Sequence, residues 1–131
     1  MFLPGLSLNR FWPLLILLPA LAAPLAAHHS WAGEYFVDKT ISIHASVVKF
    51  EYGNPHSLLR LEVAGDQGAP EPWIGEWSGA GKLSNEGIGK NKLKPGDDLT
   101  VIGNPGRPPD EHRIHVLGIR RRDGFQWGRQ K

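Results

Sequence analysis

The sequence predicts an all-β fold, a small closed barrel of five to six strands with one short helical segment, preceded by a helical signal peptide. The 131 residues include 16 glycines and 11 prolines, a content that argues against long helices and favours short strands joined by tight turns. In residues 41–47 apolar and polar side chains alternate, which is the period of a half-buried strand. The complete order of patterns is three strands, a short helical segment, two further strands and a terminal hairpin.

The amino-terminal segment has the three-part pattern of a secretory signal peptide. Arg10 precedes the apolar run 11–18, and small residues interspersed with prolines follow it as far as Ala27. A membrane-spanning helix needs about 20 uninterrupted apolar residues, whereas prolines interrupt this stretch. We therefore expect residues 1–27 to be removed and residues 28–131 to form a single domain that is periplasmic or secreted, without a stable membrane anchor.

Three cleavage positions fit this pattern, and each gives the following histidine pair a different set of donor nitrogens. Cleavage after Ala27 makes His28 the amino-terminal residue, so its amine and imidazole could chelate one metal ion together. Cleavage after Ala26 makes His29 the third residue from the free amine, a spacing suited to square-planar Cu(II) or Ni(II). Cleavage after Ala22 matches the A-x-A rule best and abolishes both geometries.

The first strand of the domain is expected over residues 41–52, with a change of buried face in its middle. The apolar residues occupy odd positions up to Val47 and even positions from Val48 onward. Such a change of phase indicates a β-bulge or a sharp bend. A small closed barrel needs this bend because one strand contributes to both ends of a strongly curved sheet.

The remaining elements follow from turn signals and from shorter alternating runs. Gly53-Asn54-Pro55 ends the first strand, and Asp123-Gly124 indicates a hairpin into a short last strand. The other expected elements are a second strand from His56 to Val63, a third strand over residues 72–77, at most a short helix within residues 78–90, a fourth strand over residues 99–102, a stiff loop over residues 104–109 and a fifth strand over residues 112–119. This order matches the five-stranded Greek-key barrel called the OB-fold, whereas a β-sandwich generally has about seven strands.

Charge and cysteine content exclude several classes of protein. The 15 lysines and arginines nearly balance the 13 aspartates and glutamates, so there is no electrostatic case for binding nucleic acid or an anionic membrane. The chain has no cysteine, which excludes disulfides, thiolate metal sites, thiol nucleophiles and a lipid-modified amino-terminal cysteine. An exported domain of this kind must be stabilised by packing alone.

Short motifs spread along the chain carry a resemblance to a known family. They are His28-His29-Ser30, the sequence Glu-Tyr-Gly-Asn-Pro-His at residues 51–56, and Leu-Lys-Pro-Gly-Asp at residues 93–97 followed by Leu99 and Val101. In their order and spacing the chain resembles a family of small exported bacterial proteins, the domain-of-unknown-function family number 6152. The resemblance extends from His28 to Trp127. It implies an exported, mostly β domain and implies nothing about chemistry.

The histidines are the candidate metal ligands. His28, His29 and His56 could supply a nitrogen-rich site, which without cysteine or methionine suits Cu(II), Ni(II) or Zn(II) rather than Cu(I). Copper is the cofactor favoured by affinity. His112 and His115 are three residues apart and would lie on opposite faces of a strand, so we expect them to be separate surface residues.

A metal-free ligand face is the alternative site. In an OB-fold, ligands bind on the second and third strands, between the loops that join strands one and two and strands four and five. Here those loops are expected at residues 51–55 and 104–109, and each contains proline. Imidazole and indole rings at this face could stack on an aromatic ring or a sugar, unless both tryptophans are core residues. The residues expected at the face are Asn54, His56, Trp73 and Trp77.

Enzyme chemistry has little support in the sequence. The chain contains no Gly-x-Ser-x-Gly elbow, no His-Glu-x-x-His pair and no phosphate-binding glycine loop. Glu71 and Glu76 are flanked by turns and are expected at the solvated surface. A copper oxygenase would need an amino-terminal His28 and a substrate groove, and no other catalytic group is evident. The sequence thus predicts a non-enzymatic periplasmic binding or accessory domain, whose partner is a metal ion, a small ligand or another periplasmic protein.

Overall fold

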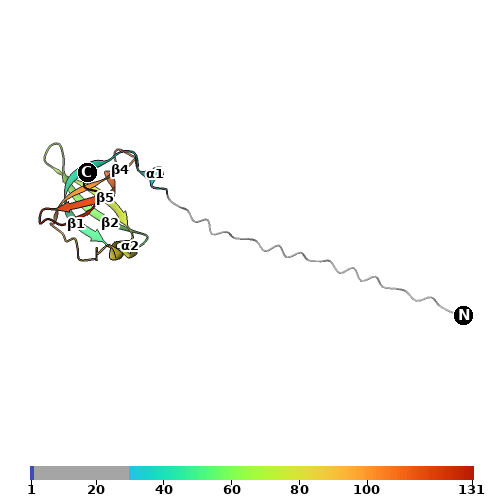
Figure 1. Cartoon of the computed structure of the whole chain (residues 1–131). Coiled ribbons are helices and arrows are strands. Elements are labelled where there is room, and N and C mark those ends of the chain that lie inside the picture. Colours follow the sequence, from blue (N-terminus) through green and yellow to red (C-terminus); the bar gives the residue numbers. More distant parts are fainter. Residues whose placement is uncertain (2–29) are drawn as a thin grey trace.

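The computed structural model describes Met1 and residues 30–131, so the expected signal peptide and the metal-ligand candidates His28 and His29 lie outside the described residues. The described part is mostly β (Figure 1). Its elements are α1 (Trp31–Glu34), β1 (Ile41–Glu51), β2 (His56–Ala64), β3 (Pro70–Ser78), α2 (Ala80–Asn85), β4 (Asp98–Pro105), β5 (Arg113–Arg121) and β6 (Gln126–Gly128). Neither of the two helices described has the length and apolar character needed to cross a membrane.

Five of the strands close into a barrel, as the sequence predicts. Neighbouring strands follow the order β3-β2-β1-β4-β5-β6, and β3 also pairs with β5 in parallel, which joins the two sides of the sheet. The short β6 is an additional strand on β5. The closed circuit of β1, β2, β3, β5 and β4, with a helix between β3 and β4, confirms the OB-like barrel.

The predicted change of face in β1 is a β-bulge. Val47 pairs with Leu61 and Lys49 pairs with Arg60, so Val48 is the extra residue of the bulged strand. Val47 is 2% exposed and Val48 is 46% exposed, as expected when the two point to opposite sides. The bulge lets one strand pair with β4 along its first half and with β2 along its second half.

The core lies inside the barrel and is built from alternate residues of the strands. Trp77 of β3 is its largest side chain and is fully buried. Residues from α2 and from the segment after it complete this core. Its buried members are Ala45, Val47, Leu59, Leu61, Trp77, Leu83, Ile88, Leu93, Leu99, Val101, Ile114, Val116 and Ile119. Full burial of a large apolar side chain contributes about 1.5–3 kcal/mol, so this interior can stabilise a barrel that has no cysteine.

The boundaries of β4 correct the expected loop at residues 104–109. Asn104 and Pro105 belong to β4, and Asn104 is only 3% exposed. Its side-chain amide donates to the carbonyl of Lys39 at 2.6 Å, so the buried polar group is satisfied. At Gly103 a Cβ atom would collide with the carbonyl of His115, so the strands approach closely there only because the residue is glycine. Gly-Asn-Pro has the composition of a turn, but pairing with β5 overrides that local preference.

The segment after the expected signal peptide packs on the outside of the barrel. It forms α1 and then an isolated bridge between Tyr35 and Gly106, at the end of β4. The amide of Phe36 donates to the carbonyl of Pro105 at 3.0 Å. Tyr35 is fully buried although it is not part of the barrel core. The segment therefore covers part of the outer face with a second, smaller packed layer.

Candidate functional site

The candidate site lies on the outer face of β3 and β5, beneath α1. The parallel pairing of these strands places Glu76 opposite His115, with Arg113 two positions earlier on the same face. The α1 segment contributes Trp31 and Tyr35, which contact this face from outside. A polar group from each strand and two aromatic rings from the amino-terminal segment are thereby brought together.

Glu76 receives hydrogen bonds from three side chains. Its Oε2 accepts from the Tyr35 hydroxyl at 2.6 Å and from the Arg113 guanidinium at 2.9 Å, and its Oε1 lies 2.6 Å from His56 Nδ1. The Glu76 side chain is 12% exposed. Burial alone raises the pKa of this carboxyl, but hydrogen bonds from Tyr35 and His56 outweigh burial and hold the pKa below its ordinary value. Glu76 is therefore a partly buried, ionised carboxylate that accepts hydrogen bonds and does not donate.

This carboxylate fixes the tautomer of His56. Because ionised Glu76 can only accept, His56 Nδ1 carries the proton of their shared hydrogen bond. In the neutral ring the lone pair is then on Nε2, which has no hydrogen-bond partner within residues 30–131. A histidine that donates one ring N–H to a carboxylate and presents the other nitrogen has the arrangement typical of a metal ligand.

A cavity of about 230 Å³ lies beside His56. It is lined by Ser30, Trp31, Glu34, Pro55, His56 and Glu76. Ser30 is the residue directly after His29, and successive Cα atoms are about 3.8 Å apart. The described part of the domain therefore begins, at Ser30, at the cavity that His56 also lines.

His115 is covered by Trp31. Their rings stack with centroids 3.7 Å apart and 12° between the planes, and Trp31 also lies against the His56 ring at 4.6 Å. Burial lowers the pKa of His115 below its ordinary value, although the negative charge of Glu76 opposes this effect. His115 Nδ1 lies 3.4 Å from Asn104 Oδ1, which orients the ring. The His115 ring thus forms the surface on which Trp31 packs.

The β4–β5 loop holds α1 in place. Arg107 donates from its side chain to the carbonyl of Ala32 at 2.8 Å and from its amide to the carbonyl of Glu34 at 2.9 Å. The Glu34 carboxylate pairs with Arg113 at 3.2 Å. The loop before β2 also lies beside the site, since its residue Pro55 lines the cavity. The two loops expected to flank the site therefore both lie beside it.

The other residues of the expected ligand face are not gathered with His56. Trp77 is fully buried in the core, which is the alternative to a place on the ligand face. Trp73 pairs with Leu61 while His56 pairs with Ser78, which separates the two by roughly 16 Å along the strand. Trp73 instead stacks on His112, with ring centroids 5.1 Å apart.

Asn54 lies close to His56 in sequence but faces α2. Its Oδ1 accepts weakly from the amide of Gly81 at 3.4 Å, and the side chain is exposed. The carbonyl of Gly53 accepts from the amide of Ala80 at 2.7 Å in the same region. These contacts join the loop before β2 to α2, which is a structural role.

Sequence reasoning missed most of this site. The sequence predicts Glu76 at the solvated surface and His115 as a separate surface residue, and both predictions are wrong because β3 and β5 pair beneath α1. Trp31, Tyr35 and Arg113 were not singled out at all. One signal was present: Trp31 and Tyr35 have the four-residue spacing that places two side chains on one face of a helical turn.

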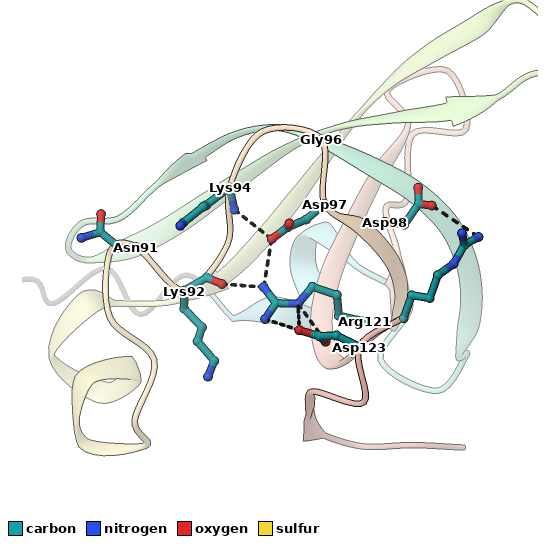
Figure 2. Close-up of a pocket in the computed structure, with 9 residues that line it drawn as sticks. Asn91, Lys92, Lys94, Gly96, Asp97, Asp98, Arg121 and Asp123 are labelled. Carbon is teal, nitrogen blue, oxygen red and sulfur yellow. Dashed lines mark hydrogen bonds and ion pairs between the residues drawn. The ribbon is translucent and has the colours of Figure 1, made fainter.

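A larger cavity, of about 670 Å³, lies between the α2–β4 loop and the β5–β6 hairpin (Figure 2). Figure 2 shows the Arg121 side chain directed at Asp97, at the carbonyl of Lys92 and at Asp123. Arg122 pairs with Asp98 at 3.5 Å. The two arginines pair with the three aspartates here, so they act as a structural tie between loop and hairpin.

Within residues 30–131 no three His, Asp or Glu side chains are placed to hold a metal ion together. Comparison with known proteins gives one family. The model of a family described as "Family of unknown function (DUF6152)" matches residues 17–115. No curated protein matches the chain.

Proposed function

The chain belongs to a family of unknown function (DUF6152), and on that premise we propose that it is an exported, non-enzymatic binding domain that holds one divalent metal ion. Copper(II) is the favoured metal, and the proposed ligands are His28, His29 and His56. The observation that carries the proposal is the 2.6 Å contact between His56 Nδ1 and the Glu76 carboxylate.

The His56–Glu76 pair supports a role for His56 as a metal ligand because it leaves the other ring nitrogen, Nε2, available. A carboxylate on one ring nitrogen fixes the tautomer, orients the ring and raises the basicity of the other nitrogen. The His56 side chain is 34% exposed, so Nε2 can be reached from outside.

The remaining donors come from the residues next to the cavity rim. Ser30 lines the cavity with His56, and His29 and His28 precede it directly in the chain. The described residues hold no three-ligand cluster of their own, so a complete site requires His28 and His29. Cleavage after Ala26 or Ala27 would add a free amine as a further nitrogen donor. An all-nitrogen set of this kind has its highest affinity for Cu(II) among the divalent metals of the first row.

Export is supported by the signal-peptide pattern of residues 1–27. Intact mass of the protein recovered from the periplasm or medium tests it. The expected product lacks the residues up to Ala22, Ala26 or Ala27. Recovery of the full-length chain in the cytosol contradicts the proposal.

Metal titration of the exported protein tests the site. Wild type is expected to take up about one equivalent of Cu(II) with a visible d–d band, which His28→Ala weakens. His56→Ala is expected to lower the affinity at least tenfold. The matched control is His112→Ala, because the His112 side chain is 35% exposed and contacts Trp73 on another part of the surface. Equal Cu(II) affinities for His56→Ala and His112→Ala would show that His56 is not a metal ligand.

A silent titration would favour a metal-free role for the same cavity. In that case a small ligand or a periplasmic partner is expected to change tryptophan fluorescence in the presence of a chelator, because Trp31 lines the cavity. Titration with Cu(II), Ni(II) and Zn(II) before ligand screening separates the two functions.

A further inference from the structure

The cavity beside His56 offers hydrogen-bond acceptors to a ligand. An ionised carboxylate has about four acceptor sites, and at Glu76 the side chains of Tyr35, Arg113 and His56 occupy three of them. The Nε2 atom of His56 adds a lone pair that has no partner within residues 30–131. A ligand that satisfies these two groups must therefore bring N–H or O–H donors.

The charged side chains that line the cavity are carboxylates. Glu34 and Glu76 line it, and no lysine or arginine of residues 30–131 does. Arg113 pairs with both, at 3.2 Å from Glu34 and 2.9 Å from Glu76, but it is not one of the lining residues. The guanidinium of Arg107 lies over the ring of Phe36 instead, 4.7 Å from its centroid. Two negative charges against the one guanidinium that pairs with them leave this wall attractive to a cation.

The rest of the lining suits a small organic cation. The rings of Trp31 and Pro55 supply apolar surface, and indole is the side-chain ring that attracts cations most strongly. Sites for drug-sized ligands have volumes of roughly 300–1,000 Å³, whereas this cavity has about 230 Å³. It therefore has room for a short alkyl chain that carries one charged group.

We propose that this cavity binds a small primary ammonium ion, with Glu76 and His56 Nε2 accepting from its N–H groups and Glu34 supplying further negative charge. A primary ammonium has three donors and no acceptor, which complements this lining. A neutral alcohol lacks the charge, and a quaternary ammonium lacks the donors. The proposal rests on the binding role of the cavity, and it requires neither a metal ion nor a group from outside residues 30–131.

The experiment titrates the exported protein with n-butylammonium in the presence of a chelator. NMR shifts of the Trp31 indole and of the His56 ring protons report binding at the cavity. Two probes of similar shape, 1-butanol and butyltrimethylammonium, are expected to bind at least about tenfold more weakly, because neither can donate charged hydrogen bonds to these acceptors. Equal affinity of either probe would overturn the proposal, since apolar contact or attraction to the indole ring would then account for binding.

A matched pair of variants tests the carboxylate. The Glu34 and Glu71 side chains are 41% and 43% exposed, and Glu71 lies near His112, away from the cavity. We expect Glu34→Gln to weaken n-butylammonium binding about threefold to fivefold and Glu71→Gln to leave it unchanged. His56→Ala should weaken it as well, because the Nε2 acceptor is lost. Equal losses in the two glutamine variants would show that only the general surface charge matters, and would refute the site.

A separate Cu(II) titration without amine distinguishes this site from the proposed metal site. If Cu(II) binds and n-butylammonium does not, the ammonium site is refuted and the metal site stands. If n-butylammonium binds and Cu(II) does not, the metal site fails and the ammonium site stands. If neither binds, both proposals are refuted.

Discussion

Trp31 stacks flat on His115, with ring centroids 3.7 Å apart and 12° between the ring planes. The two residues come from opposite ends of the domain sequence, one before the first strand and one in the strand that closes the barrel. Aromatic pairs of this kind contribute about 0.5–1.5 kcal/mol beyond the area they bury. The stack makes the short α1 turn an integral part of the domain and shields part of the His115 ring from water.

Removal of the indole is expected to change the titration of His115. Burial is the main reason that the pKa of His115 lies below its ordinary value, so Trp31→Ala should raise this pKa toward about 6.5. The shift can be followed by NMR of the imidazole ring protons as a function of pH. Trp73→Ala serves as the control because Trp73 stacks on His112 instead. An unchanged His115 pKa in Trp31→Ala would show that another group excludes water from the ring.

Acid should remove the stability that Glu76 provides. Its pKa is lower in the folded protein than in the unfolded chain, so its contribution is complete above the unfolded pKa of about 4.3 and disappears as pH falls through the folded value. We expect Glu76→Gln to be less stable than wild type by about 1–3 kcal/mol at pH 7. This difference should shrink at pH 3. Urea unfolding at both pH values measures it, and a gap that does not depend on pH would contradict the prediction.

A substitution in the core should lower the free energy of unfolding far more than one at the bulge. Leu61 is 1% exposed and packs in the barrel interior, so Leu61→Ala is expected to lower the free energy of unfolding by about 2–5 kcal/mol. Val48 is 46% exposed, and Val48→Ala should change it by less than about 0.5 kcal/mol. Similar losses for the two variants in chemical denaturation would mean that the β1–β2 register differs from the one described.

Arg121 tests the tie between the α2–β4 loop and the β5–β6 hairpin. Its guanidinium binds Asp97, Asp123 and the carbonyl of Lys92, and the side chain is 20% exposed. A lysine keeps the charge but cannot make this set of bonds, so Arg121→Lys should lower stability by about 1–2 kcal/mol. Arg122→Lys is the matched control, since that side chain is 87% exposed. Thermal unfolding compares the two variants, and equal melting temperatures would refute the structural role.

The barrel could be predicted because its main signals are local. The alternation in β1 and the change of phase at Val47 and Val48 encode a bulge directly, since side chains in a strand alternate between faces. The end of β4 could not be predicted in the same way. Gly103 and Asn104 have the composition of a turn, and only the pairing with β5 makes them strand residues.

The site was harder to predict because it depends on contacts between distant segments. His56 was identified from its place at the start of the second strand. Glu76 and His115 meet only through the parallel β3–β5 pairing, which leaves no pattern within either segment. The α1 turn has four residues, too few to be stable without the surface on which it packs, so the spacing of Trp31 and Tyr35 does not by itself predict that the turn docks on the barrel.

The β3–β5 pairing also sets the order in which the domain can be completed. The pairings β1–β2, β2–β3 and β1–β4 need only strands that precede β5 in the chain. The second edge of β3, in contrast, stays unpaired until β5 is available. Glu76 acquires Arg113 only when β5 pairs with β3, so the full set of hydrogen bonds to this carboxylate is completed together with the barrel itself.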